Sequence, residues 1–560
     1  MQSMLEQAVG GSTNASALQM SKSEARSAVL GASLGTLFEW YDFYVYGLVA
    51  TVVAKRFFAG LDPTSAFILA LMGFGAGFIV RPLGAVIFGR IGDMIGRKYT
   101  FLVTIVIMGG ATFGTGLLPT YEVAGILAPV LLVGLRLLQG LAIGGEYGGA
   151  AVYVSEHAPK GKRGFYTSWI QTTGTAGMLL ALVVVIATTF VTGDHFSVWG
   201  WRIPFLVSLP LLVVSLKIRA SLHESPIFKK MKEQGTSSRA PLREAFGNWK
   251  NLRVVLIALG GVCAGQTVIY FTCQFFPLFF LTQTLKVDSK TANTLVMVAL
   301  MIGCPLFVVF GALSDRVGRK PVLLFGLILA GATFFPIYKG LTHYANPALE
   351  RAQKLAPVIL HADLSECSFQ FNPTGTKRFT SSCDVAKQLL AQSGANYETV
   401  GATAGSIATV ELGNTVIRSY AASSMTPAES AGADKSFRSS IAVALKQAGY
   451  PASAAPTEIN YFGVLALLVL LMGYAAATYS VVGATLVELF PARIRYTSFS
   501  VPYHVATGWL GGLQPTVSFA LIAQIGNIYS GLWYPTIVIA VSTVVAVLFL
   551  RETKNVDVHV

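Results

Sequence analysis

The chain has 560 residues, of which 53% are hydrophobic and only 12% are charged, and its mean hydropathy is +0.60. This composition excludes an ordinary soluble domain and indicates a protein that crosses a membrane several times. The formal net charge of +14 does not indicate nucleic-acid binding, because the basic residues lie in short segments between apolar runs, where they anchor and orient helices.

The predicted elements begin with a polar tail, residues 1–27, which has no apolar run followed by a small-residue cleavage site. We therefore expect a cytoplasmic tail and no signal peptide. Six apolar runs of spanning length follow. They cover residues 28–50, 66–89, 100–118, 124–153, 165–191 and 201–218.

A basic linker, 219–253, separates these runs from a second set, and the whole polar break from 217 to 253 contains nine Lys or Arg against three Glu. The second set is also six runs, and a short tail, 551–560, follows it. The runs cover residues 254–283, 291–313, 321–338, 460–490, 496–524 and 532–550.

The runs predict an all-α integral membrane protein with twelve transmembrane helices in two pseudo-symmetric six-helix bundles. The first bundle is 28–218, and the second is 254–340 together with 460–550. The strongly basic loops fall on one side of this topology, so the Lys/Arg bias predicts a multi-pass protein of the cytoplasmic (inner) membrane with both termini in the cytoplasm. We expect it to function as a monomer.

The long segment 341–459 interrupts the second bundle and falls on the extracytoplasmic side, with nine acidic and nine basic residues. Two stretches in it, "CDVAKQLLAQSG" and "FRSSIAVALKQAGY", have the apolar spacing of short amphipathic helices. Cys367 and Cys383 lie in this insert. In an oxidising compartment they can form a disulfide, and two free thiols are the open alternative.

The sequence repeats itself. "GRIGDMIGRK" (Gly89 to Lys98) recurs as "GALSDRVGRK" (Gly311 to Lys320), each after the second run of its half. A looser echo follows the fourth run of each half, with Glu156, Pro159 and Arg163 matched by Glu488, Pro491 and Arg495. Two similar halves around a central site are the architecture of alternating-access transporters.

The repeated pattern of Gly, three residues, Asp, two residues and Gly-Arg-Lys resembles the signature loop of the major facilitator superfamily. "FEWYDFYVYG", "RPLGAVIFGRIGD", "RLLQGLAIGGEYGGA" and "ESPIF" are similar to its metabolite/proton symporter branch, whose members carry organic acids, shikimate, proline or betaine. The resemblance covers about 28–340 and 460–550, whereas the insert departs from it. It implies that the acid in "EWYDF" couples to protons and that basic residues bind an anionic substrate.

The repeated loops are suited to a gate. Gly89 and Gly311 permit close helix approach, while Asp93 and Asp315 can pair with Arg or with exposed helix N-terminal amides. The alternative is that these charges only anchor a turn at the membrane interface. The predicted gating residues are Gly89, Asp93, Arg97, Gly311, Asp315, Arg319, Glu146 and Arg163.

Glu39 and Asp42 lie three residues apart inside the first run, on one helix face with Tyr46 one turn further on. A carboxylate facing lipid costs about 3 kcal/mol on insertion scales, so these acids must face a polar cavity, a partner charge or both. We predict that Asp42 or Glu39 carries the coupling proton. Permanent ion pairs that only fix helix packing are the structural alternative.

Arg81 and Arg136 are the expected partners of these acids. Arg136, Gln139 and Glu146 share one face of the fourth run and predict a polar stripe that lines the pathway. Tyr474, Tyr479, Trp509 and Gln514 are further polar or aromatic groups in later spans, and the aromatic ones can equally be packing residues. The predicted substrate-binding residues are Arg81, Arg136, Gln139, Tyr46, Gln266, Tyr270, Gln274 and His504.

These features predict a secondary active transporter that couples proton entry to uptake of a small organic acid or zwitterion, with no cofactor other than the proton. The chain contains no GxxxxGK[ST], HExxH or GxSxG sequence, which argues against a nucleotide-driven pump and a membrane enzyme, and we predict no metal site. An exchanger or facilitator of the same fold, or a nutrient sensor that uses the insert without net transport, remain alternatives.

Overall fold

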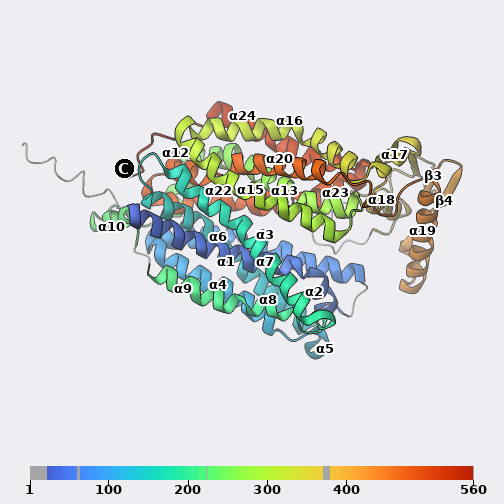
Figure 1. Cartoon of the computed structure of the whole chain (residues 1–560), viewed down its shortest axis with the longest axis horizontal. Helices are drawn as coiled ribbons and strands as arrows, with labels where there is room; N and C mark the ends of the chain where they lie inside the picture. Colours follow the sequence, from blue (N-terminus) through green and yellow to red (C-terminus); the bar gives the residue numbers. More distant parts are fainter. Residues whose placement is uncertain (1–21, 60–62, 222–223, 370–378, 559–560) are drawn as a thin grey trace, which may run out of the picture.

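The computed structural model describes residues 22–59, 63–221, 224–369 and 379–558, and it consists of two helical bundles packed side by side (Figure 1). Within these described residues, nine helices are long and apolar enough to cross a membrane. The predicted count of twelve transmembrane helices therefore stays a prediction, although each predicted run coincides with a helical segment. Most of the predicted tail, 1–27, lies outside the described residues.

The described residues of the first half form helices and the turns between them. Its long helices are joined by short turns, and the fourth predicted run is preceded by one turn of helix. The elements are α1 (Lys22–Leu48), α2 (Ala50–Phe57), α3 (Pro63–Met94), α4 (Arg97–Leu117), α5 (Tyr121–Ala124), α6 (Leu127–His157), α7 (Arg163–Thr192), η2 (Gly193–Ser197), α8 (Arg202–Leu206) and α9 (Ser208–Ala220).

The linker contributes the short helices α10 (Pro226–Glu233) and α11 (Pro241–Gly247). The second half follows them, and its seventh and eleventh predicted spans are interrupted by short π-helical turns, η3, η4 and η7. Its elements are α12 (Trp249–Ile257), η3 (Ala258–Cys263), α13 (Ala264–Gln274), α14 (Phe276–Phe279), η4 (Phe280–Thr284), α15 (Ser289–Val317), α16 (Arg319–Ala345), α20 (Tyr461–Tyr479), α21 (Val482–Leu489), η6 (Ala492–Ile494), α22 (Arg495–Val505), η7 (Ala506–Gly511), α23 (Gln514–Ile525), η8 (Ser530–Leu532) and α24 (Trp533–Phe549).

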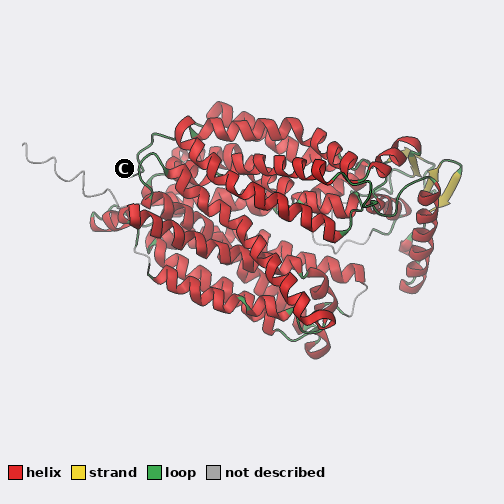
Figure 2. Ribbon diagram, in the orientation of Figure 1, coloured by secondary structure: helices red, strands yellow, loops and turns green. Residues whose placement is uncertain are grey.

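The insert is a small α+β unit, so the all-α prediction is wrong for this part of the chain (Figure 2). Four short strands form a sheet of order β2-β1-β3-β4, in which β1 pairs parallel with β2 and antiparallel with β3. The two predicted amphipathic helices are confirmed as α18 and α19. The elements are α17 (Pro347–Leu355), β1 (Val358–Ala362), α18 (Ser382–Ser393), β2 (Tyr397–Gly401), β3 (Thr409–Leu412), β4 (Thr415–Arg418), η5 (Ala422–Ser424) and α19 (Pro427–Gln447).

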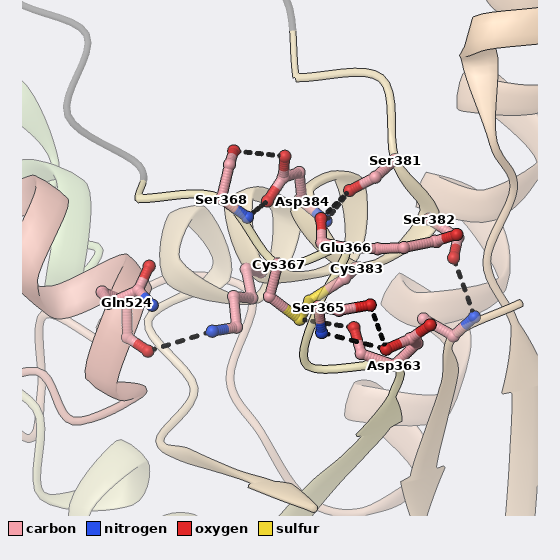
Figure 3. The surroundings of a disulfide bond; sticks show 12 residues. Asp363, Ser365, Glu366, Cys367, Ser368, Ser381, Ser382, Cys383, Asp384 and Gln524 are labelled. Atoms are coloured by element: carbon pink, nitrogen blue, oxygen red, sulfur yellow. Dashed lines mark hydrogen bonds between the residues drawn. A yellow bond between two sulfur atoms is a disulfide. The ribbon is translucent and has the colours of Figure 1, made fainter. Parts of the chain in front are cut away.

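A disulfide joins Cys367 and Cys383, so of the two states left open by the sequence the structure contains the bonded one (Figure 3). Next to it, Asp384 at the start of α18 accepts hydrogen bonds from the backbone N–H and the hydroxyl of Ser368 at 2.8 and 2.5 Å. The bond therefore ties the loop after β1 to α18, which packs beside the sheet.

The insert packs against the second half, at the end of α23 and at the segment after η4. Tyr397 donates its backbone N–H to the carbonyl of Gly526 at 2.7 Å and its hydroxyl to the carbonyl of Ala523, while Lys387 donates to the carbonyl of Gln524 at 3.2 Å. These bonds satisfy the last carbonyls of α23, which have no partner inside their own helix. A second contact joins Lys286, after η4, to the carbonyl of Gln392 at 2.5 Å.

The start of α1, the linker helix α10 and the C-terminal end of the chain lie at one end of the bundles, and the insert lies at the other (Figure 1). The insert therefore lies at the opposite end of the bundles from the start of α1 and from the C-terminal tail. We call the first end the gate end, because it carries Asp93 and Asp315, and the other the insert end.

Candidate functional site

At the gate end, Asp93 of α3 binds the first turn of α22 in the other half. Its two carboxylate oxygens accept the backbone N–H groups of Tyr496 and Thr497 at 3.1 and 2.9 Å, and Arg97 lies 3.6 Å away. Arg97 also donates to the carbonyl of Ala492 at 3.0 Å. Both partners predicted for this aspartate, an arginine and helix N-terminal amides, are present.

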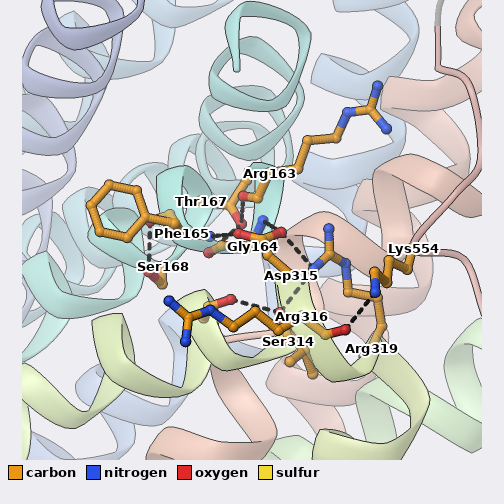
Figure 4. Close-up of polar contacts among 12 residues, drawn as sticks. Arg163, Gly164, Phe165, Thr167, Ser168, Ser314, Asp315, Arg316, Arg319 and Lys554 are labelled. Carbon is orange, nitrogen blue, oxygen red and sulfur yellow. Dashed lines mark hydrogen bonds and ion pairs between the residues drawn. The ribbon is translucent and has the colours of Figure 1, made fainter. Parts of the chain in front are cut away.

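Asp315 of α15 makes the matching contact in the opposite direction (Figure 4). It accepts the backbone N–H groups of Gly164 and Phe165, in the first turn of α7, at 2.9 and 2.8 Å. Arg319 donates to the same carboxylate at 2.7 Å. Each half therefore caps a helix of the other half with a carboxylate, which suits the positive end of the helix dipole.

Two buried glutamates extend these clusters. Glu156 lies 2.8 Å from Arg495, and Glu488 lies 3.7 Å from Arg163, so each of these ion pairs crosses between the halves. Arg319 also binds Glu488, at 3.1 Å. The charged residues of the looser repeat thus occupy equivalent positions in the two halves. Of these four residues, the predicted gating set contains Arg163 and omits Glu156, Glu488 and Arg495.

A third layer of contacts is absent from the predicted set. Glu224 accepts the backbone N–H groups of Arg97 and Lys98, both at 3.2 Å, and Glu552 accepts those of Arg319 and Lys320 at 2.9 and 3.0 Å. Burial alone would raise the pKa of Glu552, but backbone N–H donors led by that of Arg319 hold it below its ordinary value. Each carboxylate caps the helix that follows its half's Gly-Arg-Lys loop.

The C-terminal segment continues across the gate end. Thr553 donates its hydroxyl to Glu488 at 2.7 Å. Further along, the carbonyls of Val556 and Val558 accept from Arg163 and Arg495, both at 2.8 Å. The tail therefore contacts the two arginines that pair across the halves.

Gly89 and Gly311 lie where helices of the two halves cross closely, as predicted. A Cβ on Gly89 would lie 3.0 Å from the Cα of Thr497, and a Cβ on Gly311 would lie 2.5 Å from the Cβ of Ser168. A side chain at either position would separate α3 from α22 or α15 from α7.

Glu39 is not paired with Arg81 or Arg136, which corrects the prediction. Its partner is Arg219 of α9, whose Nη1 lies 3.5 Å from the Glu39 carboxylate and whose Nη2 binds Glu146. Arg219 lies at the edge of the basic linker, where the expected role of a cation is to anchor a helix at the membrane interface. The predicted site therefore does not include it. Glu146 belongs to this buried cluster rather than to the gate contacts.

Asp42 lies beside Thr112 and Arg136, and one of its carboxylate oxygens, Oδ1, has no hydrogen-bond partner among the described residues. Arg136 stacks on the ring of Tyr46 at 4.0 Å, and its Nε and Nη2 likewise have none there. Gln139 donates to the hydroxyl of Thr112. The four predicted residues Asp42, Arg136, Gln139 and Tyr46 are thus brought together.

Arg81 lies apart from any acid in the described part of the chain. Its guanidinium packs on the rings of Phe78 and Phe43, at 4.1 and 4.7 Å, and Nε and Nη2 make no hydrogen bond to a described residue. The side chain is only 1% exposed. A buried guanidinium without a counter-charge is costly, so this position is suited to receive an anion.

The second half contributes polar groups that are also unsatisfied within the described chain. Both ring nitrogens of His504, Oε1 of Gln266 and the whole amide of Gln274 are buried without a hydrogen-bond partner there. Tyr270 of α13 places its hydroxyl 3.3 Å from that of Tyr44 of α1, so it joins the two halves.

A group of buried tyrosines lies at the junction of the two halves, where Tyr270 meets Tyr44. Tyr147 stacks on Tyr503 at 4.1 Å between ring centres, and the hydroxyls of Tyr479 and Tyr503 are 2.5 Å apart. Tyr270 is 5.0 Å from Tyr479. This aromatic surface includes Tyr479, for which the sequence allows either a packing role or a role in the transport pathway.

The other aromatic and amide candidates lie elsewhere. Trp509 is half exposed on the outside of the bundle and donates to the carbonyl of Ile79 at 3.3 Å. Tyr474 accepts a hydrogen bond from Thr333 at 3.0 Å, and Gln514 donates to Ser518 at 3.1 Å. Trp509 and Tyr474 thus have the contacts of packing residues, whereas Oε1 of Gln514 is buried without a hydrogen-bond partner in the described chain.

The side chains at the junction are all buried, so the structure has this region closed to solvent. A shallow surface hollow lies at the linker, lined by Arg239, Arg243, Glu244 and Arg493 among others. The arrangement combines unsatisfied cationic and amide donors, a carboxylate with a free oxygen and tyrosine faces. It is chemically suited to a small solute with a carboxylate, held between the two halves.

Comparison with known proteins gives a consistent set of relatives. The sequence model described as "Sugar (and other) transporter" matches residues 28–240. A proline/betaine transporter of Salmonella typhimurium (strain LT2) is 41% identical over 326 residues, which are 56% of this chain and 64% of the relative. The shikimate transporter of Escherichia coli (strain K12) is 37% identical over 326 residues, 58% of this chain and 74% of the relative. The chain thus spans just under two thirds of the length of the proline/betaine relative.

A solved structure has the same fold. The proton:xylose symporter XylE, bound to 6-bromo-6-deoxy-D-glucose, superposes with a TM-score of 0.60 at 18% identity and covers 96% of this chain and 98% of its own. The relatives and the structural neighbour described here are all transporters and none is an enzyme.

Proposed function

The chain belongs to the major facilitator superfamily, and we propose that it is a proton-coupled symporter that takes up a small carboxylate-bearing metabolite, an organic acid or a zwitterion, by alternating access. In this proposal it lies in the inner membrane with both termini in the cytoplasm, so the gate end faces the cytoplasm. It needs no bound cofactor and works as a monomer.

The observation that carries the proposal is Arg81, a buried guanidinium with two nitrogens that have no partner in the described chain. Burying a charge without a counter-charge costs several kcal/mol, and a carboxylate ligand would offset that cost. Arg81 lies near Tyr44, Tyr270 and Tyr503 of both halves, so a bound carboxylate would contact α1, α3, α13 and α22 together.

The tyrosines support a zwitterion as one substrate class. An ammonium or quaternary ammonium group is attracted to the faces of tyrosine rings, and Tyr147, Tyr479 and Tyr503 present such faces at the junction. The names of the relatives, which include transport of proline/betaine and of shikimate, support the same range of substrates.

Asp42 is the proposed coupling residue, because its carboxylate lies beside Arg136 and has an oxygen free to take a proton. Protonation would neutralise Asp42 and release Arg136, while deprotonation would restore their attraction. The closed contacts at the gate end, with Asp93 and Asp315 as caps, support a state in which the cytoplasmic side is shut.

Uptake by proteoliposomes with an imposed proton gradient tests the proposal. The panel contains proline, glycine betaine, shikimate and citrate. We expect one of these classes to accumulate and a protonophore to abolish the accumulation. Arg81→Gln should raise the half-saturation concentration by roughly thirtyfold, the value for losing a charge-assisted hydrogen bond of about 2 kcal/mol.

The matched control is Arg56→Gln, which removes a partly exposed arginine of α2. Accumulation that persists with the protonophore would support a facilitator or exchanger instead. Binding of the solutes without any net uptake would support a sensor. An unchanged half-saturation concentration in Arg81→Gln would show that this arginine does not bind the substrate.

A further inference from the structure

Glu39, Glu146 and Arg219 form a buried cluster near the gate end of the first half. Arg219 Nη1 lies 3.5 Å from Glu39, and Nη2 binds Glu146. Glu39 is 6% exposed, and Glu146 and Arg219 are each 2% exposed. Thr104 of α4 completes the cluster by donating its hydroxyl to Glu146 at 2.9 Å.

The charges of this cluster do not balance. Two carboxylates meet one guanidinium, and among the described side chains no second Lys or Arg forms an ion pair with either of them. The neighbouring elements add no compensation, because Asp42, one turn along α1, is another acid, and Tyr496 of α22 uses its hydroxyl to bind the carbonyl of Gly145. A fully ionised cluster would hold an uncompensated negative charge in a buried place, which costs several kcal/mol.

Both carboxylates contact the one guanidinium of Arg219, so they lie close to each other. A hydrogen bond between two carboxyl groups requires a proton on one of them, because an ionised carboxylate only accepts. One shared proton would therefore both bridge Glu39 and Glu146 and bring the net charge of the cluster to zero.

We propose that Glu39, Glu146 and Arg219 are a second proton-binding site, distinct from Asp42, in which the two carboxylates share one proton. The site is built into the fold, because Gly35 leaves the space that the Arg219 guanidinium fills, and a Cβ at this position would collide with it.

The cluster lies on the gate side of Asp42, since α1 runs from the gate end and Glu39 precedes Asp42 along it. Tyr496 links it to the gate: its hydroxyl binds Gly145, beside Glu146, and its backbone N–H binds Asp93 at 3.1 Å. Movement of α22 away from α3 would withdraw Tyr496 and open the cluster to the gate side. This second step, release of the proton in each transport cycle, rests on the proposed function, whereas the shared proton does not.

Infrared difference spectroscopy of the purified full-length protein tests the shared proton directly. A protonated carboxyl has a C=O stretch that an ionised carboxylate lacks and that shifts on deuteration. We expect the wild type at neutral pH to show such a band. Glu39→Gln and Glu146→Gln should each abolish it, because one carboxylate then pairs with Arg219 and needs no proton.

Asp42→Asn is the control that should keep the band, and Gly35→Ala should alter it by displacing Arg219. Thermal unfolding of each variant shows that it is folded before its spectrum is compared. Absence of the band in the wild type, or its persistence in both glutamine variants, would overturn the proposal.

Counting protons per substrate in proteoliposomes tests release in the cycle, and Glu146→Gln should lower the ratio by one relative to the wild type. The two proposals fail separately. Proton-driven accumulation with an unchanged ratio in Glu146→Gln would reject release and leave the symporter proposal standing. The expected band without proton-driven uptake would reject the symporter and leave the shared proton in place.

Discussion

Asp93 and Asp315 cap each other's half of the molecule. Each carboxylate accepts two backbone N–H groups from the first turn of a helix in the opposite bundle, α22 for Asp93 and α7 for Asp315. The two positions are equivalent in the sequence repeat, so one duplicated loop makes two reciprocal contacts. The gate end is thus closed by contacts that each half makes to the other, and not by a single one.

Asp93→Asn and Asp315→Asn should each weaken this closure. An amide keeps the shape but makes a neutral hydrogen bond, which is about half as strong as one to a carboxylate. We expect the ratio of closed to open molecules to fall by roughly tenfold for each change, because about 1.4 kcal/mol corresponds to that factor. Spin labels at Lys160→Cys and Val317→Cys, on exposed positions of the two halves, would report a longer distance.

Asp288→Asn is the matched control. Asp288 caps α15 by accepting the N–H of Thr291 at 2.9 Å, at the insert end and within its own half. The Asp288→Asn variant should leave the distance between the two spin labels at the wild-type value. If both gate variants also do so, these two aspartates do not hold the halves together.

Ending the chain at Lys554 should also favour opening at the gate end. This truncation removes the carbonyls of Val556 and Val558 that bind Arg163 and Arg495, but keeps Glu552 and Thr553. The two guanidinium groups would lose one acceptor each, at about 1 kcal/mol for each hydrogen bond. The same label pair measures the effect, and Asn555→Ala, an exposed change within the tail, is the control.

The contribution of Glu552 should depend on pH. Its pKa is held below the ordinary value by backbone N–H donors, which outweigh its burial. A carboxyl with a lowered pKa in the folded state stabilises the fold above its unfolded pKa of about 4.3, and this stabilisation is lost as the pH falls through the folded value.

Glu552→Gln should therefore lower the apparent unfolding temperature at neutral pH by about 2 °C, the size of a lost helix cap. The difference from the wild type should shrink as the pH falls below the folded pKa. Glu233→Gln, an exposed carboxyl of α10, is the control and should leave the unfolding temperature unchanged at both pH values. A difference of constant size across the pH range would show that charge on Glu552 is not what stabilises the fold.

Removing the disulfide should affect the insert and leave the bundles intact. The bond closes a loop of 16 residues, for which the loss is about 3 kcal/mol. Cys367→Ser with Cys383→Ser, or reduction of the wild type, should make the insert sensitive to limited proteolysis while the helical unfolding transition stays in place. Cys304→Ser is the control, and equal proteolysis of the double variant and the wild type would contradict the prediction.

The parts of the site that could be predicted are those encoded locally. Asp93 and Asp315 stand in a ten-residue motif that occurs twice, and a short motif brings its own geometry. Asp42, Arg136 and Gln139 could be inferred because a charge or amide within an apolar run has few uses other than a polar site.

The remaining parts depend on contacts between distant segments. Arg219 reaches Glu39 from 180 residues away along the chain, and no local pattern distinguishes it from the other basic residues of the linker. Arg81 was expected to pair with an acid, but it packs on Phe43 and Phe78 instead, since ring faces also accommodate a guanidinium. The strands of the insert are four or five residues long, too short for their alternation to stand out.

The docking of the insert has a practical consequence. Tyr397 and Lys387 attach it to the end of α23, and Lys286 attaches it after η4, so these anchors all belong to the second half. If the halves rock against each other, the insert travels with one of them as a rigid passenger. An antibody fragment that binds the insert would therefore move with the second half. The angle between the fragment and the first half, followed by imaging, would report the motion without any change to the transport path.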